Sequence, residues 1–135
     1  MNEQPAIAYV RTVEGTLAIQ VEDEFVLGAA GELEPQPVEL NLPRLVAAAA
    51  SGSTVIAVVD RRPPLLVSGD AGATWREAGG GLPLGFAVAI DPDDPDRVLY
   101  AARNRLYLST DGGRFWRSLE PELPDIEAVG WATAP

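Results

Sequence analysis

Short apolar runs separated by turn-forming residues recur along the whole chain. Leu65-Leu66-Val67 and Leu106-Tyr107-Leu108 are two such runs, and each is followed closely by Ser, Asp and Gly. The 12 prolines and 13 glycines are spread between the runs instead of being clustered. Because Pro and Gly interrupt helices and occupy turns, this pattern predicts an all-β protein made of many short strands.

Two segments of the chain repeat without a gap. Ser68–Trp75 and Ser109–Trp116 both fit Ser-x-Asp-x-Gly-x-x-Trp, and the two tryptophans lie 41 positions apart. Each copy follows an apolar run and is itself followed by Leu-Pro, at Leu82 and at Leu123. Two complete copies at one fixed period, with matching flanks, predict a repeated structural unit.

The residue types of the motif suit a tight turn between two strands. An Asp side chain accepts hydrogen bonds from the N–H groups of a turn. Gly adopts a positive φ that other residues resist, and Trp packs back across the hairpin as a large apolar group. We therefore expect a structural role for eight residues: Ser68, Asp70, Gly72, Trp75, Ser109, Asp111, Gly113 and Trp116.

These paired motifs resemble the BNR or Asp-box repeat, whose family forms β-propellers. The resemblance is most specific over residues 54 to 119, and an altered copy without the Asp and the Trp covers Phe25–Gly31. The stretch Ala89–Ala101 is also similar to units of photosystem II assembly-factor-like and sortilin-like propellers. The resemblance implies that each Asp-box is a structural hairpin between the third and fourth strands of a blade, usually away from any active site.

The repeat predicts three four-stranded blades, at about residues 5–42, 43–82 and 83–123. The expected strands are Ile7–Thr12, Thr16–Val21, Phe25–Gly28 and Val38–Asn41, then Leu45–Ala50, Val55–Val59, Leu65–Ser68 and Trp75–Ala78, then Phe86–Ile90, Val98–Ala102, Leu106–Ser109 and Phe115–Leu119. The first strand of each blade is rich in Ala, which suits the crowded axis of a propeller. A single helical turn at Val46–Ala50 is the alternative, because Ala is the best helix former.

Three blades do not close a propeller, since closed rings have typically four to eight blades. Residues 126–134 follow the third Leu-Pro and predict a spare strand, in the place of a fourth blade's innermost strand. An exposed sheet face with a spare strand is a surface for association. We expect a homo-oligomer, a six-bladed dimer in preference to a nine-bladed trimer, with Trp131 at the inter-chain junction. Stacking of Trp131 on a ligand, a ring completed by a different protein, and a fragment of a longer gene are the alternatives.

The composition removes several classes of chemistry. The chain has no Cys, no His and no Lys. It therefore offers no disulfide, no thiolate or imidazole metal site, no imidazole base and no Schiff-base lysine. A formal charge of −10 disfavours binding to nucleic acid or to an anionic membrane. No apolar run reaches the roughly 18 residues of a membrane span, and no secretory signal is recognisable. We expect a cytoplasmic protein with no cofactor.

Two candidate sites have simpler explanations. The carboxylates of Asp91–Asp96 could form a calcium loop, but the EF-hand spacing is missing and two prolines stiffen the segment, which favours a solvated turn. A sialidase-like glycosidase needs clustered arginines and two carboxyl groups facing each other, yet Arg11 is the only arginine in an expected first strand. The sequence favours a non-catalytic scaffold or protein-interaction module. A carbohydrate-binding, lectin-like propeller is the alternative, and a glycosidase comes third.

Charged turns are expected on opposite faces of the blades. Turns between second and third strands carry Arg61, Arg62, Arg103 and Arg105. The opposite face receives Asp91, Asp93, Asp94 and Asp96 together with Asp70 and Asp111. The first blade breaks this pattern, with Glu22, Asp23 and Glu24 in place of arginines. Because guanidinium groups bind carboxylates and phosphates bidentately, the four arginines are candidates for docking an unidentified protein partner. Polar turns without such a role are the alternative.

Overall fold

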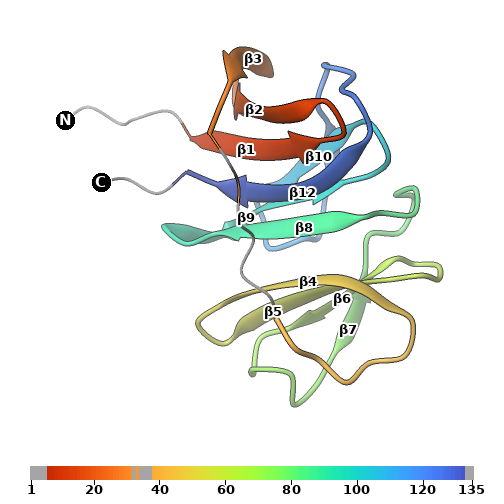
Figure 1. Ribbon diagram of the computed structural model, residues 1–135. Coiled ribbons are helices and arrows are strands. Elements are labelled where there is room, and N and C mark those ends of the chain that lie inside the picture. The colour runs from red at the N-terminus through yellow and green to blue at the C-terminus, as the bar shows by residue number, and fades with distance from the viewer. Residues whose placement is uncertain (1–5, 32, 34–37, 133–135) are drawn as a thin grey trace.

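The computed structural model describes residues 6–31, 33 and 38–132. Over these residues the chain forms twelve β-strands in three four-stranded antiparallel sheets (Figure 1). The described residues contain no helix, and therefore none that could cross a membrane. The all-β prediction is confirmed.

The two complete repeats form two sheets in which the strands pair in chain order. The β4 sheet consists of β4 (Leu45–Ser51), β5 (Thr54–Val59), β6 (Leu65–Ser68) and β7 (Arg76–Ala78). The β8 sheet consists of β8 (Ala87–Asp91), β9 (Asp94–Ala101), β10 (Leu106–Ser109) and β11 (Arg117–Ser118). The helical turn considered for Val46–Ala50 is wrong, because this segment pairs with β5, whose Val and Ile residues favour a strand.

The third sheet joins the two ends of the chain. The β1 sheet has the order β12-β1-β2-β3 and consists of β1 (Ile7–Thr12), β2 (Gly15–Gln20), β3 (Phe25–Ala29) and β12 (Ile126–Trp131). β12 is antiparallel to β1, with Val129 opposite Val10. The prediction of a spare strand at residues 126–134 is therefore wrong over the described part of that segment. β12 is the innermost strand of the β1 sheet, where Ile126 and Val129 complete an apolar core.

This pairing shifts the predicted first blade by one strand. β1 is the second strand of its sheet instead of the first, and Phe25–Ala29 is the fourth instead of the third. Val38–Asn41, predicted as the fourth strand, forms no strand. The described residues of the expected blade 5–42 form three strands, and the innermost strand of their sheet is β12, from the other end of the chain.

The β8 sheet lies between the other two sheets. Its face with Val88 and Tyr100 packs against the β4 sheet, and its opposite face with Ala89 and Leu99 packs against the β1 sheet. The innermost strands β4, β8 and β12 lie side by side, with β8 in contact with both neighbours (Figure 1). The sheets therefore form an arc in the order β4 sheet, β8 sheet, β1 sheet.

Tyr100 is the largest fully buried side chain of the described residues and anchors the contact between the β4 and β8 sheets. Its ring meets Tyr107 and Trp116 edge-on, at centroid distances of 6.2 and 5.8 Å. Its hydroxyl donates to Pro83 O at 2.6 Å, and burial raises the pKa of Tyr100. A Cβ on Gly85 would overlap the Tyr100 ring, so only glycine fits beside it.

Candidate functional site

The turn after β6 is closed by two side chains. Ser68 Oγ donates to Asp70 Oδ1 at 2.7 Å and accepts the N–H of Gly72 at 2.8 Å. The Asp70 carboxylate accepts the Thr74 N–H at 2.9 Å and the Thr74 hydroxyl at 2.6 Å. Ala71 and Gly72 both have positive φ, of 59° and 92°. Since this conformation is costly for Ala, the hydrogen bonds hold the turn in a shape that the backbone alone disfavours.

The turn after β10 repeats this arrangement. Ser109 Oγ donates to Asp111 Oδ1 at 2.8 Å and accepts the N–H of Gly113 at 2.9 Å. Asp111 Oδ1 also accepts the N–H groups of Arg114 and Phe115, at 3.1 and 3.0 Å. In each sheet this turn joins the third strand to the fourth, which is the place that the resemblance implies for an Asp-box.

The tryptophans of the two motifs cover the turn glycines. A Cβ on Gly72 would lie 3.4 Å from the Trp75 ring, and one on Gly113 would lie 3.6 Å from the Trp116 ring. Trp116 Nε1 donates to Gly113 O at 2.9 Å, and its ring packs against the core between the β4 and β8 sheets. These contacts are structural.

We expect acid to weaken the Asp-box turns. Hydrogen bonds from Thr74 and Ser68 lower the pKa of Asp70 from 3.8 to about 2, and bonds from Phe115 and Ser109 lower the pKa of Asp111. A folded-state pKa below the unfolded value stabilises the fold above the unfolded pKa, and this contribution is lost as pH falls from about 4 to about 2. Melting curves of the wild type and of Asp70→Asn, recorded over this range, measure the effect.

The Tm of the wild type should fall more steeply with acid than the Tm of Asp70→Asn, whose amide does not titrate. Asp93→Asn changes an exposed aspartate outside the motif and is the matched control. It is expected to follow the wild type. Parallel curves for the wild type and Asp70→Asn would contradict a role of the ionised carboxylate in the turn.

The four candidate arginines lie in turns on one face of the arc. Arg61 and Arg62 lie between β5 and β6, and Arg103 and Arg105 lie between β9 and β10. The second of these turns contacts the segment between β11 and β12, because Asn104 O accepts the Leu123 N–H at 2.9 Å. The arginine turns therefore share a face with connections between sheets.

Three of these four arginines form ion pairs with nearby acidic side chains. The sequence did not predict these pairs. The ion pairs are Arg61–Glu77 at 3.7 Å, Arg103–Asp125 at 3.2 Å and Arg105–Glu122 at 3.1 Å. Arg62 makes no ion pair within the described part of the chain, and its charge partly offsets the raised pKa of Tyr100. The pairs reduce the positive charge of the face, but surface pairs of this kind are weak.

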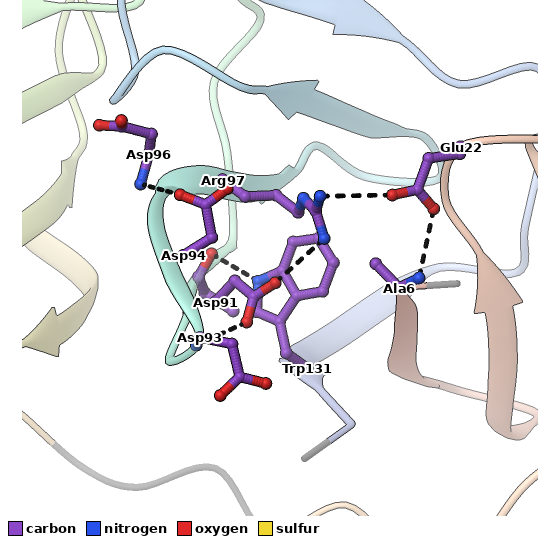
Figure 2. A network of polar contacts seen from close by, with 9 residues as sticks. Ala6, Glu22, Asp91, Asp93, Asp94, Asp96, Arg97 and Trp131 are labelled. Carbon is purple, nitrogen blue, oxygen red and sulfur yellow. Dashed lines mark hydrogen bonds and ion pairs between the residues drawn. The ribbon is translucent and has the colours of Figure 1, made fainter. Parts of the chain in front are cut away.

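The opposite face carries a polar network centred on Arg97 (Figure 2). Arg97 contacts Asp91 Oδ2 at 3.3 Å and Glu22 Oε1 at 3.5 Å, and Glu22 also accepts the Ala6 N–H at 3.3 Å. The prediction that Glu22 lies on the arginine face is wrong. Because β2 is the third strand of its sheet, the turn after it emerges on the Asp-box face. Arg97 thus connects the β8 and β1 sheets.

Two of the four carboxylates of residues 91–96 accept hydrogen bonds within their own hairpin. Asp91 Oδ1 accepts the Asp93 N–H at 2.9 Å, and Asp94 Oδ1 accepts the Asp96 N–H at 3.2 Å (Figure 2). Among the residues that the structure describes, no three potential metal-ligating side chains gather. These bonds are those of a polar turn.

Trp131 makes its contacts inside one chain. Its Nε1 donates to Ala89 O at 3.1 Å (Figure 2), and its ring packs against the core between the β8 and β1 sheets. Within the chain this contact fastens β12 to β8, and an inter-chain role of Trp131 stays a prediction.

Two clefts between the β4 and β8 sheets were not predicted. A cleft of about 470 Å³ lies among the Asp-box turns and is lined by charged residues that include Arg76 and Asp96. A second, of about 410 Å³, is lined by Tyr107, Phe115 and Trp116. Phe115 is 79% exposed. Phe115 lies in the turn before β11, beside Trp116, whose ring packs inward.

Comparison with known proteins identifies the fold. Family models and curated proteins give no match to the sequence. The structure of YCF48 bound to D1 peptide is similar over 91% of this chain and 39% of that chain, with 15% identity and a TM-score of 0.50. The three sheets are blades of a β-propeller. The prediction of four-stranded propeller blades is confirmed, the extra strand is wrong because β12 belongs to the β1 sheet, and closure of the ring by oligomerisation stays a prediction.

The Niastella koreensis GH74 enzyme is also similar, over 85% of this chain and 18% of that chain, with 23% identity and a TM-score of 0.47. This chain thus spans well under half the length of either protein. In the propeller, the β4, β8 and β1 sheets are successive blades, and β4, β8 and β12 are their innermost strands.

Proposed function

We propose that this chain is a non-catalytic β-propeller module that assembles with copies of itself and presents a surface to a protein partner. The observation that carries the proposal is the arc of three blades with exposed apolar side chains on both end blades. Phe25 is 58% exposed in the β1 sheet, and Val46 is 44% exposed in the β4 sheet. Soluble monomers rarely expose large apolar patches, so such surfaces favour association.

The number of blades favours a dimer. Closed propellers have typically four to eight blades. Two copies supply six blades and three copies supply nine, so the dimer falls within the usual range.

The composition supports a non-catalytic role. The chain has no His, Cys or Lys, which are common bases and nucleophiles. Asp70 and Asp111 accept hydrogen bonds inside their turns, and Asp91 is paired with Arg97. These three carboxylates are therefore engaged in structural contacts.

The YCF48 structure supports the binding of a protein partner, since it contains a bound D1 peptide. We extend peptide binding to this chain and assign it to the arginine face, formed by Arg61, Arg62, Arg103 and Arg105. Guanidinium groups bind carboxylates bidentately. The existing ion pairs of this face are exposed, so an acidic peptide can compete for the arginines.

We expect acidic peptides to bind to the arginine face. An array of peptides with clustered Asp and Glu, probed with the labelled chain, should show binding that Arg61→Glu with Arg103→Glu abolishes. This double reversal removes two cations and places new carboxylates beside Glu77 and Asp125. Asp93→Asn with Asp94→Asn changes the opposite face and is the matched control, which should bind as the wild type does.

Peptide binding that survives the double reversal but fails in the control variant would move the docking site to the acidic face. A chain that binds no peptide on the array would contradict the protein-binding part of the proposal. The oligomeric mass of each variant should stay that of the wild type, because neither pair of substitutions lies on the apolar faces.

A lectin-like function is the second candidate, and the aromatic cleft favours it. Tyr107, Phe115 and Trp116 line this cleft together with Arg114, which offers rings and a hydrogen-bond donor to a sugar. Binding on a glycan array that Phe115→Ala abolishes would favour this function over peptide binding.

A further inference from the structure

We infer that the outward face of the β1 sheet packs, head to tail, against the outward face of the β4 sheet of a second copy. The inference rests on the self-assembly proposed above and names the surfaces that carry it. A second copy is the occupant because these two faces continue the series of blade contacts that one chain already forms. Within the chain, the β4 sheet packs on the β8 sheet and the β8 sheet packs on the β1 sheet.

The outward face of the β1 sheet carries two aromatic rings, beside an ion pair between Arg11 and Glu127. Ala8 and Val10 are buried against the β8 sheet, and side chains alternate along a strand, so Tyr9 between them points away from the β8 sheet. On β3, Val26 packs against the same core, so Phe25 beside it also points outward. This face therefore presents the rings of Tyr9 and Phe25.

The outward face of the β4 sheet presents small side chains along β4. Ala49 and Ile56 are partners in the register of β4 and β5, and both contribute to the core against the β8 sheet. The next pair, Ala48 with Ala57, therefore faces outward. Ala50 has the same orientation and is exposed. Ala57 is fully buried within its own chain, so Ala48 and Ala50 are the alanines of this face that a second copy can contact.

In a row of residues across three neighbouring strands, the β4 sheet lacks the two aromatic rings that the β8 sheet carries at the equivalent positions. Across the β8 sheet the row is Val88, Tyr100 and Tyr107. Across the β4 sheet it is Ala48, Ala57 and Leu66. The first row packs its rings onto aliphatic side chains of the β4 sheet. In the proposed contact the rings come from the opposite partner, so an aromatic face again meets a small aliphatic one, as close packing requires.

The contact joins two different faces, so each copy uses one face for each neighbour. Heterologous contacts of this kind close into rings when the rotation between copies allows it. At the axial end of the aromatic face, Leu33 already lies over Gly130, where a Cβ would be 2.8 Å from Leu33 Cδ1. The region left for the second copy is therefore the one around Tyr9 and Phe25.

Two variants and their mixture test this contact by native mass spectrometry. Tyr9→Glu and Ala50→Arg should each halve the mass of the wild-type dimer, because each places an unpaired charge in an apolar contact. An equimolar mixture should return to the dimer mass, since the new carboxylate and guanidinium meet at one contact and the other contact is unchanged. Phe115→Glu, on an exposed ring outside both faces, is the control and should stay dimeric.

The outcomes separate this inference from the self-assembly on which it rests. A wild type of single-chain mass would end both. If the wild type and both variants, Tyr9→Glu and Ala50→Arg, are dimeric, only the assignment of the faces is overturned. A mixture of monomeric variants that fails to reassemble would also overturn it, because mixing brings the new carboxylate and guanidinium together only when the contact joins two different faces. Melting curves check that each variant folds, and Phe25→Glu, at a side chain 58% exposed, replaces Tyr9→Glu if that variant does not.

Discussion

Removing residues 126–135 is expected to abolish cooperative folding of the chain. The deletion takes away β12, the innermost strand of the β1 sheet, together with the buried side chains of Ile126 and Val129 and the ring of Trp131. Each large apolar side chain contributes about 1.5–3 kcal/mol when fully buried, and a domain is stable by only about 5–15 kcal/mol. β1 would also lose its hydrogen-bonded neighbour and become an exposed edge.

Circular dichroism melts and hydrogen exchange measure this loss. The truncated chain should show no cooperative transition, or one at a much lower temperature, and amides of β1 should exchange rapidly. A truncation after Ala132 keeps β12 and is the control. If the chain ending at residue 125 melts like the control and only its oligomeric mass changes, β12 belongs to a contact between chains and the pairing with β1 is wrong.

Tyr100→Ala is expected to lower the free energy of unfolding by about 3–5 kcal/mol, the range for truncating a buried aromatic ring. Tyr100 is fully buried and contacts both Tyr107 and Trp116. The substitution leaves a cavity between the β4 and β8 sheets and removes the hydrogen bond to Pro83 O. Urea denaturation of the wild type and the variant gives the difference directly.

Phe115→Ala truncates an aromatic ring in the turn between β10 and β11, where Phe115 is 79% exposed. As a surface substitution it should change the stability by no more than about 0.5 kcal/mol. Equal effects at Tyr100 and Phe115 would show that the contact between the two sheets is not the packed core described above.

The strands of the β4 and β8 sheets could be predicted because each contains a complete motif. Ser68, Asp70 and Trp75 fix the position of one turn, and the same residue types recur at Ser109, Asp111 and Trp116. A turn of known type locates the third and fourth strands, and the apolar runs before it then locate the first and second. Local sequence carries this information, since every pairing joins neighbouring segments of the chain.

The β1 sheet was misplaced by one strand because it lacks this anchor. Phe25–Gly31 was aligned with an Asp-box although neither the Asp nor the Trp is present. A period-2 pattern shows that a segment is a strand but does not show its place in a sheet. The pairing of Val10 with Val129 joins the two ends of the chain, and no local signal reports so distant a contact.

The candidate site was predictable in position but not in its interactions. The predicted positions of the turns put Arg61 and Arg103 on one face. Their ion pairs with Glu77 and Asp125 could not be predicted, because they depend on which side chains the folded backbone brings within reach. The same limit applies to Arg97, whose contact with Glu22 crosses from one sheet to another.

The central claim, a partial propeller that assembles with itself, is tested most directly by the mass of the native wild-type protein in solution. Native mass spectrometry, supported by sedimentation at micromolar concentration, should give twice the chain mass of 14.3 kDa, because two arcs of three blades supply the six blades of a closed ring. A stable, folded species of 14.3 kDa at all concentrations would contradict the account.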